Sequence, residues 1–122
     1  MVETSLVGPD IAVGEAVLAA LDAAKFPVTV ALWLRETEED KWELVLSTPR
    51  YREDDIYLQA ILAIRSRVPI VDFPIRIESN LRPLIKALRL KQKLGLSLEG
   101  RRLGPQALGG VWVRDAYVYR IK

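Results

Sequence analysis

The stretch of sequence that decides the fold reads VTVALWLR (28–35), ETEEDK (36–41) and WELVLST (42–48). Successive side chains of a strand point to opposite faces of a sheet, and the first run is apolar at both even and odd positions. Such a strand lies at the centre of a sheet, or its second face is covered by a helix or a partner chain. We therefore predict a β-hairpin with an acidic tip, whose first strand is buried on both sides.

The hydrophobic spacing outside this hairpin alternates between helical and extended patterns. The resulting order, α-β-β-α-β-α-β-β, predicts a single α+β domain over residues 1–122. We expect a mixed or mainly antiparallel sheet of four to five strands, packed with three helices. The predicted helices span residues 11–25, 56–67 and 81–93, and the further predicted strands span residues 73–78, 98–103 and 111–121. The last of these is either one strand or a hairpin bent at Asp115, and residues 104–110 are expected to form a loop.

Helical spacing also predicts which side chains of the second and third helices face the core. The side chains expected there are Tyr57, Leu58, Ile61, Leu62 and Val68 in the second helix, and Leu81, Leu84, Ile85 and Leu88 in the third.

The composition excludes several classes of chemistry. The chain has 122 residues without His or Cys, which removes disulfides, imidazole and thiol metal sites, and every Ser-His or Cys-His pair. The usual glycine-rich nucleotide-binding loops are also missing. We assign no catalytic residue, metal ligand or cofactor. One enzymatic alternative is a Mg²⁺-dependent hydrolase that uses the acidic clusters Glu36–Asp40 and Glu53–Asp55.

Charge is divided unevenly along the chain. Residues 1–61 hold 12 acidic and 5 basic side chains, whereas residues 62–122 hold 4 acidic and 13 basic ones. This asymmetry fits a polyanionic partner for the second half, contacts between copies of the chain, or mutual attraction of the two halves within one fold.

The third predicted helix carries the clearest charge pattern. Arg82, Lys86, Arg89 and Lys93 recur at helical spacing, and no acidic residue occurs between positions 80 and 98 to pair with them. A basic stripe of this kind suits contacts with phosphates. The segment Gly100–Gly104 could extend the patch. The candidate anion-binding or nucleic-acid-binding residues are therefore Arg82, Lys86, Arg89, Lys93, Arg101 and Arg102.

Two tryptophans flank the acidic tip of the hairpin. Trp33 and Trp42 are candidates for the aromatic centre of an interface if they are exposed, and they are core residues if they are not.

Together these features predict a non-catalytic protein interaction module that self-associates, most simply as a dimer. The alternative is a nucleic-acid-binding protein that uses the basic helix face, and an acidic protein is a further possible partner. Residues 1–5 do not resemble a signal peptide, and charges interrupt every apolar run before it reaches membrane-spanning length. We therefore expect a cytoplasmic location and no membrane partner.

Overall fold

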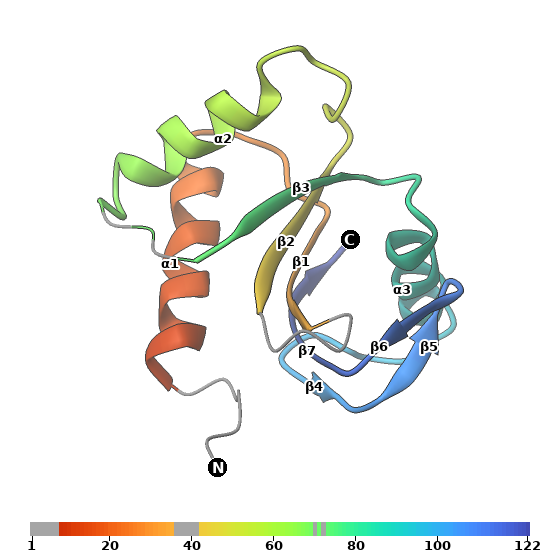
Figure 1. Ribbon diagram of the computed structural model, residues 1–122. Coiled ribbons are helices and arrows are strands. Elements are labelled where there is room, and N and C mark those ends of the chain that lie inside the picture. Colours follow the sequence, from red (N-terminus) through yellow and green to blue (C-terminus); the bar gives the residue numbers. More distant parts are fainter. Residues whose placement is uncertain (1–7, 36–41, 70, 72) are drawn as a thin grey trace.

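The computed structural model describes residues 8–35, 42–69, 71 and 73–122. Within these ranges the chain forms three helices, a five-stranded mixed sheet and a separate two-stranded hairpin (Figure 1). The predicted α+β class is confirmed. The elements are α1 (Gly8–Ala23), β1 (Val30–Arg35), β2 (Glu43–Thr48), α2 (Ile56–Arg65), β3 (Ile75–Ser79), α3 (Pro83–Lys93), β4 (Arg102–Leu103), β5 (Gln106–Leu108), β6 (Val111–Val113) and β7 (Asp115–Ile121).

The strand order in the sheet is β3-β2-β1-β7-β4. β1 occupies the middle and pairs antiparallel with both β2 and β7. β3 lies parallel to β2, as the intervening helix α2 allows, and β4 pairs antiparallel with β7. β5 and β6 form the separate hairpin. Of the placements predicted for the first strand, the one at the centre of the sheet is therefore confirmed.

Each face of the sheet carries its own hydrophobic core. The first core lies between the sheet and helices α1 and α2, and β1 contributes Ala31 and Trp33 to it. The second core lies between the sheet, α3 and the β5–β6 hairpin, and β1 contributes Val30, Leu32 and Leu34. Figure 1 shows these two layers on opposite sides of the sheet. Both apolar faces of β1 are thus covered by elements of the same chain.

On the first face, α1 approaches β7 closely at a glycine. A Cβ atom added to Gly14 would lie 2.1 Å from the hydroxyl oxygen of Tyr119. That hydroxyl donates a hydrogen bond to the carbonyl oxygen of Ile11 (2.6 Å) and accepts one from Nε1 of Trp33 (2.8 Å). The missing side chain at Gly14 therefore makes room for a polar link between α1, β1 and β7.

On the second face, the turn of the β5–β6 hairpin touches the start of α3. Leu108 pairs with Val111, so the loop has two residues, Gly109 and Gly110, and both have positive φ angles of 58° and 81°. A Cβ atom on Gly109 would lie 2.3 Å from the carbonyl oxygen of Pro83, whereas one on Gly110 would meet nothing within 4 Å. The absence of a side chain at Gly109 therefore allows both the positive φ angle of the turn and the close contact with α3.

The core face predicted for α2 is largely wrong. The buried side chains of this helix are Ile56, Ala60 and Ile64, while Ile61 is only partly buried. The helix is apolar around most of its circumference, so two faces fitted the periodicity. The side turned to the core includes the small Ala60. Three side chains expected in the core are exposed instead, namely Tyr57, Leu58 and Leu62.

The inner face of α3 was predicted correctly except at its start. Leu84, Ile85 and Leu88 are fully buried, but Leu81 is exposed. The reason is that the helix begins at Pro83, so Leu81 precedes it and does not share its periodicity.

The C-terminal quarter differs from the prediction in two places. β5 lies inside the expected loop at residues 104–110, and β4 covers only the last two residues of the strand expected at 98–103. The segment 111–121 divides next to Asp115, but β6 and β7 do not pair with each other. β6 pairs with β5, and β7 pairs with β1 and β4. The alternative of a hairpin bent at Asp115 is therefore wrong.

Candidate functional site

The local sequence places α3 with one side against the sheet and the other in solvent. Before the helix, the Ser79 hydroxyl accepts a hydrogen bond from the backbone N–H of Leu81 (3.0 Å). Pro83 then occupies the first turn, where its missing N–H costs nothing. The helix ends at Lys93, and Gly95 follows with a φ of 92°.

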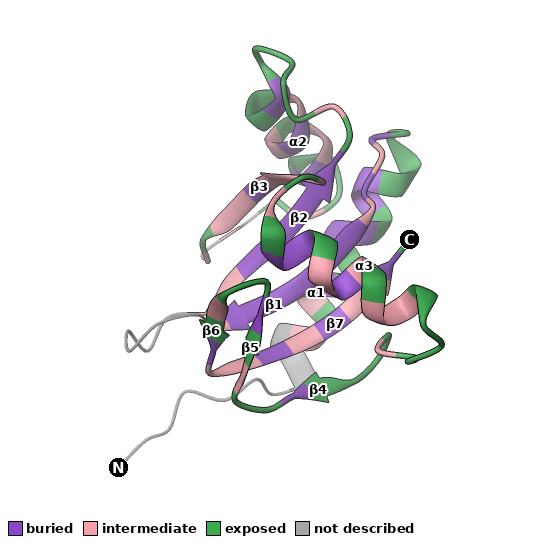
Figure 2. Cartoon of the chain, turned by 90° about the vertical axis from the view of Figure 1, so that its right-hand side faces the viewer, coloured by how far each residue is buried: buried purple, intermediate pink, exposed green. Residues whose placement is uncertain are grey.

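Figure 2 shows that buried and exposed stretches alternate along α3. The solvent-facing side of α3 carries two parallel strips of side chains, which together we call the α3 outer face. The apolar strip includes Leu90, which is 56% exposed, and Leu94, which is 72% exposed. Beside it runs the basic strip, each member of which directly precedes a member of the apolar strip. Residues of both strips and Leu81 line an open hollow of about 600 Å³. The apolar strip consists of Pro83, Ala87, Leu90 and Leu94, and the basic strip consists of Arg82, Lys86, Arg89 and Lys93.

The four cations of the basic strip differ in what they contact. Nη1 of Arg82 forms an ion pair with Glu78 (2.6 Å), and Nε of Arg89 donates to the backbone oxygen of Lys122 (2.8 Å). Lys86 and Lys93 are exposed, and neither has an acidic partner in the part of the chain that the structure describes. These two lysines are therefore the most available positive charges of the strip.

The other two predicted anion-binding residues lie outside α3. Arg102 makes two hydrogen bonds to the carboxylate of Asp115 (2.8 and 3.1 Å), and its guanidinium lies 5.7 Å from the ring centre of Trp42. This side chain therefore joins β4 to β7. Arg101 is exposed and follows Gly100, whose φ is 76°.

The tryptophans do not form an exposed pair. Trp33 is only 3% exposed, belongs to the first core and packs edge-on against Phe73 (ring centres 5.0 Å apart). Trp42 is half-buried against the same core, with Arg35 and Arg102 near its ring. Trp33 as an interface residue is therefore corrected to a core residue, because its face of β1 is covered by the helices.

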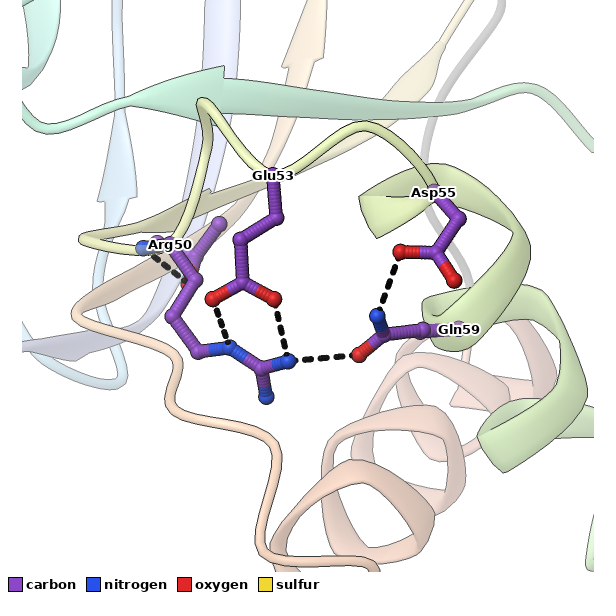
Figure 3. A network of polar contacts seen from close by, with 5 residues as sticks. Arg50, Glu53, Asp55 and Gln59 are labelled. Atoms are coloured by element: carbon purple, nitrogen blue, oxygen red, sulfur yellow. Dashed lines mark hydrogen bonds and ion pairs between the residues drawn. The ribbon is translucent and has the colours of Figure 1, made fainter.

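At the start of α2, the acidic side chains Glu53 and Asp55 are hydrogen-bonded to neighbouring side chains (Figure 3). The guanidinium of Arg50 donates to both carboxylate oxygens of Glu53 (2.6 and 2.7 Å) and to Gln59 (2.6 Å). Gln59 in turn donates to Asp55 (2.6 Å). The hydrogen bond from Arg50 lowers the pKa of Glu53. No group of acidic residues suited to hold a metal ion occurs among the described residues, and Glu36–Asp40 lie outside them.

The acidic and basic halves of the chain meet on the first face of the sheet. Arg120 of β7 donates two hydrogen bonds to Asp22 of α1 (2.6 and 2.9 Å), and these bonds lower the pKa of Asp22. A second contact between the halves, from Arg76 to Glu43 (2.6 Å), joins β3 to β2 on the second face. A second, smaller hollow of about 340 Å³ lies beside Asp22 and is also lined by Glu15 and Tyr117. Part of the charge asymmetry is therefore neutralised within the fold.

The chain has no significant match among protein family models, curated proteins or solved structures. None of the helices in the described residues is long and apolar enough to span a membrane. The candidate site consequently rests on the geometry of the α3 outer face. The basic strip was predicted from the sequence, while the apolar strip was missed, although its spacing is equally visible in residues 83–94.

Proposed function

We propose that this protein is a non-catalytic interaction module that binds an acidic, leucine-containing segment of a protein partner through the α3 outer face. The observation that carries the proposal is the side-by-side arrangement of exposed leucines and available lysines on one helix surface. Leu90 and Leu94 leave apolar area in water, and Lys86 and Lys93 lie next to it without acidic partners among the described residues.

The mixture of leucines and cations favours a protein over a nucleic acid. Protein interfaces combine an apolar centre with a polar rim, and burying exposed leucine area contributes about 25 cal/mol per Å². Interfaces with nucleic acids are more polar and are dominated by contacts to phosphates. Two of the six candidate phosphate ligands, Arg82 and Arg102, are already ion-paired with Glu78 and Asp115.

Nucleic-acid binding is the second candidate function. It is favoured by the absence of acidic residues from positions 81–97 and by the exposed Arg101 that follows this segment. Phosphate contacts release counterions, so binding to an oligonucleotide would fall steeply between about 50 and 200 mM salt.

Self-association is a further prediction. The two apolar faces of β1 and the paired tryptophans favour it in the sequence, but the chain's own helices and hairpin cover both faces of β1. The charge asymmetry still permits contacts between copies. The particle mass from light scattering at high concentration tests this prediction, and a strictly monomeric particle contradicts it.

Fluorescence anisotropy with labelled peptides and oligonucleotides tests the proposed function. The probes are an acidic peptide rich in leucine, an acidic peptide with serine in place of leucine, and DNA and RNA oligonucleotides. We expect the leucine peptide to bind at least about tenfold more tightly than the serine peptide, because only the former covers the apolar strip. Equal affinity for the two peptides, or tighter binding of an oligonucleotide, contradicts the proposal.

Charge-reversed variants then locate the binding surface. Lys86→Glu/Lys93→Glu changes the outer face at two side chains that make no hydrogen bond to another described residue. The matched control, Arg65→Glu/Arg67→Glu, makes the same charge change at two exposed arginines at the end of α2. Loss of peptide binding in the first variant but not in the second is expected. An equal loss in both contradicts a site on α3.

A further inference from the structure

The spacing of the apolar strip defines the shape of what it can bind. Pro83, Ala87, Leu90 and Leu94 follow one another at intervals of four, three and four residues. This is the spacing of the a and d positions of a heptad repeat, with Ala87 and Leu94 at a, and Pro83 and Leu90 at d. In coiled coils such a seam is covered by another helix, whose side chains insert between those of the first.

From this we infer, resting on the proposed function, that the partner segment is an amphipathic α-helix that lies along α3, with apolar residues at its own a and d positions and acidic residues beside them. An extended peptide is recognised by the unpaired backbone groups of a sheet edge. The α3 outer face offers side chains at helical spacing instead. The hollow of about 600 Å³ around Ala87 provides space for a larger side chain of the docked helix.

Three lysines of α3 occupy the e and g positions, which flank the seam of a coiled coil. Lys86 and Lys93 directly precede the a positions and therefore occupy g, and Lys91 directly follows the d position Leu90 and therefore occupies e. Charges at e and g select the partner and its orientation. Among the described residues these positions carry no negative charge, so the complementary helix needs acidic side chains at its own e or g positions.

The size of the surface limits its affinity. The seam from residue 83 to residue 94 extends over about 17 Å, or about three helical turns. Contacts of this size belong to the weak and transient class of interfaces. We therefore expect dissociation constants weaker than about 1 µM.

A pair of peptides with the same composition tests the inference. The heptad peptide, about 21 residues long, carries Leu at a and d and Glu at e and g. The scrambled peptide has the same residues without the repeat. Repulsion between glutamates keeps the heptad peptide from pairing with itself at neutral pH, so a gain of helical circular dichroism on mixing reports binding as a helix.

We expect the heptad peptide to bind the protein with a gain of helicity and at least about tenfold more tightly than the scrambled peptide. Leu90→Gln should remove this preference, whereas Leu62→Gln, at an exposed leucine of α2, should preserve it. Equal binding of both peptides contradicts the helical partner and leaves the proposed function standing. Binding of neither peptide contradicts both proposals, and salt-sensitive oligonucleotide binding would then assign α3 to nucleic acid.

Discussion

The helices α2 and α3 cover opposite faces of the sheet, and both leave leucines in water, but their surroundings differ. On α2, Leu58 and Leu62 are exposed, and the acidic residues at its start are held by Arg50 and Gln59. On α3, the exposed leucines Leu90 and Leu94 have the same spacing of four residues, but Pro83 and Ala87 extend them to a line of four apolar positions with lysines beside it. Exposed leucines alone do not identify an interaction surface. The longer line of apolar positions and the lysines that accompany it give α3 the stronger case.

The two layers also pack against the sheet through different close contacts. The largest expected effect on stability concerns the contact between α3 and the β5–β6 hairpin. Gly109→Ala adds a Cβ atom 2.3 Å from a backbone oxygen at a residue with positive φ. We expect a loss of about 3 kcal/mol in the free energy of unfolding, because strain in the turn and overpacking act together. Urea unfolding measures it.

Gly110→Ala is the control for that effect, since its φ is also positive but its Cβ atom would meet nothing within 4 Å. It should cost about 1 kcal/mol. Equal losses in the two variants would show that the contact between the hairpin and α3 contributes little.

The second prediction concerns the α1 side. In an ordinary helix position Gly→Ala stabilises by about 1 kcal/mol. Gly14→Ala should instead destabilise by about 2 kcal/mol, because the methyl group displaces the Tyr119 hydroxyl from Ile11 and Trp33. Thermal unfolding measures the sign. A more stable variant would mean that Tyr119 moves aside without cost.

The third prediction separates stability from binding on the outer face. Lys86→Glu/Lys93→Glu should change the free energy of unfolding by less than about 0.5 kcal/mol, as expected for surface substitutions. The same variant should lower the affinity for the acidic heptad peptide at least about tenfold. Unfolding and peptide titrations of this variant and of Arg65→Glu/Arg67→Glu measure both quantities. Strong destabilisation by Lys86→Glu/Lys93→Glu would indicate a structural role for the lysines.

The smallest expected effect concerns the ion pair between Asp22 and Arg120. The hydrogen bonds from Arg120 lower the pKa of Asp22 in the folded state, so the pair stabilises the fold above the unfolded pKa of about 3.9 and ceases to do so as the pH falls through the folded pKa. Because the carboxylate is largely exposed, Asp22→Asn should cost less than about 0.5 kcal/mol at pH 7.

Urea unfolding of this variant at about pH 7 and about pH 2 measures the pH dependence. The difference from the unmodified protein should shrink as the pH falls, because protonation of the carboxylate removes the charge that Arg120 binds. Asp54→Asn, at an exposed position, is the control. A difference that persists unchanged at low pH contradicts the role of the charge.

The placement of an element was predictable from the sequence where its hydrophobic spacing fits one arrangement, and it was not where the spacing fits two. β1 was placed correctly because its two apolar faces allow few positions other than the sheet centre. The buried side of α2 was not, because the set containing Ile56, Ala60 and Ile64 and the set containing Leu58 and Leu62 both repeat at helical spacing. Only packing against α1 and the sheet distinguishes them. β5 was missed because three residues are too short to show alternation.

The cations of the candidate site were predictable from the sequence, but their contacts were not. Three of its cations, Lys86, Arg89 and Lys93, lie on α3 and Arg82 directly precedes it, so their spacing was visible in the sequence. Which cations are engaged depends on distant residues: Arg102 meets Asp115, and Arg89 reaches the backbone of Lys122. Trp33 was ambiguous because its exposure depends on what covers β1. Pairing and burial of this kind are tertiary properties that periodicity alone does not contain.

A charge exchange between protein and peptide tests the central claim most directly, namely that the α3 outer face docks an acidic helix. The acidic heptad peptide and a counterpart with Lys in place of Glu would each be titrated into the unmodified protein and into Lys86→Glu/Lys93→Glu. The acidic peptide should bind only the unmodified protein, and the basic peptide should bind the variant at least about tenfold more tightly than the unmodified protein. If each peptide has the same affinity for both proteins, α3 is not the docking surface.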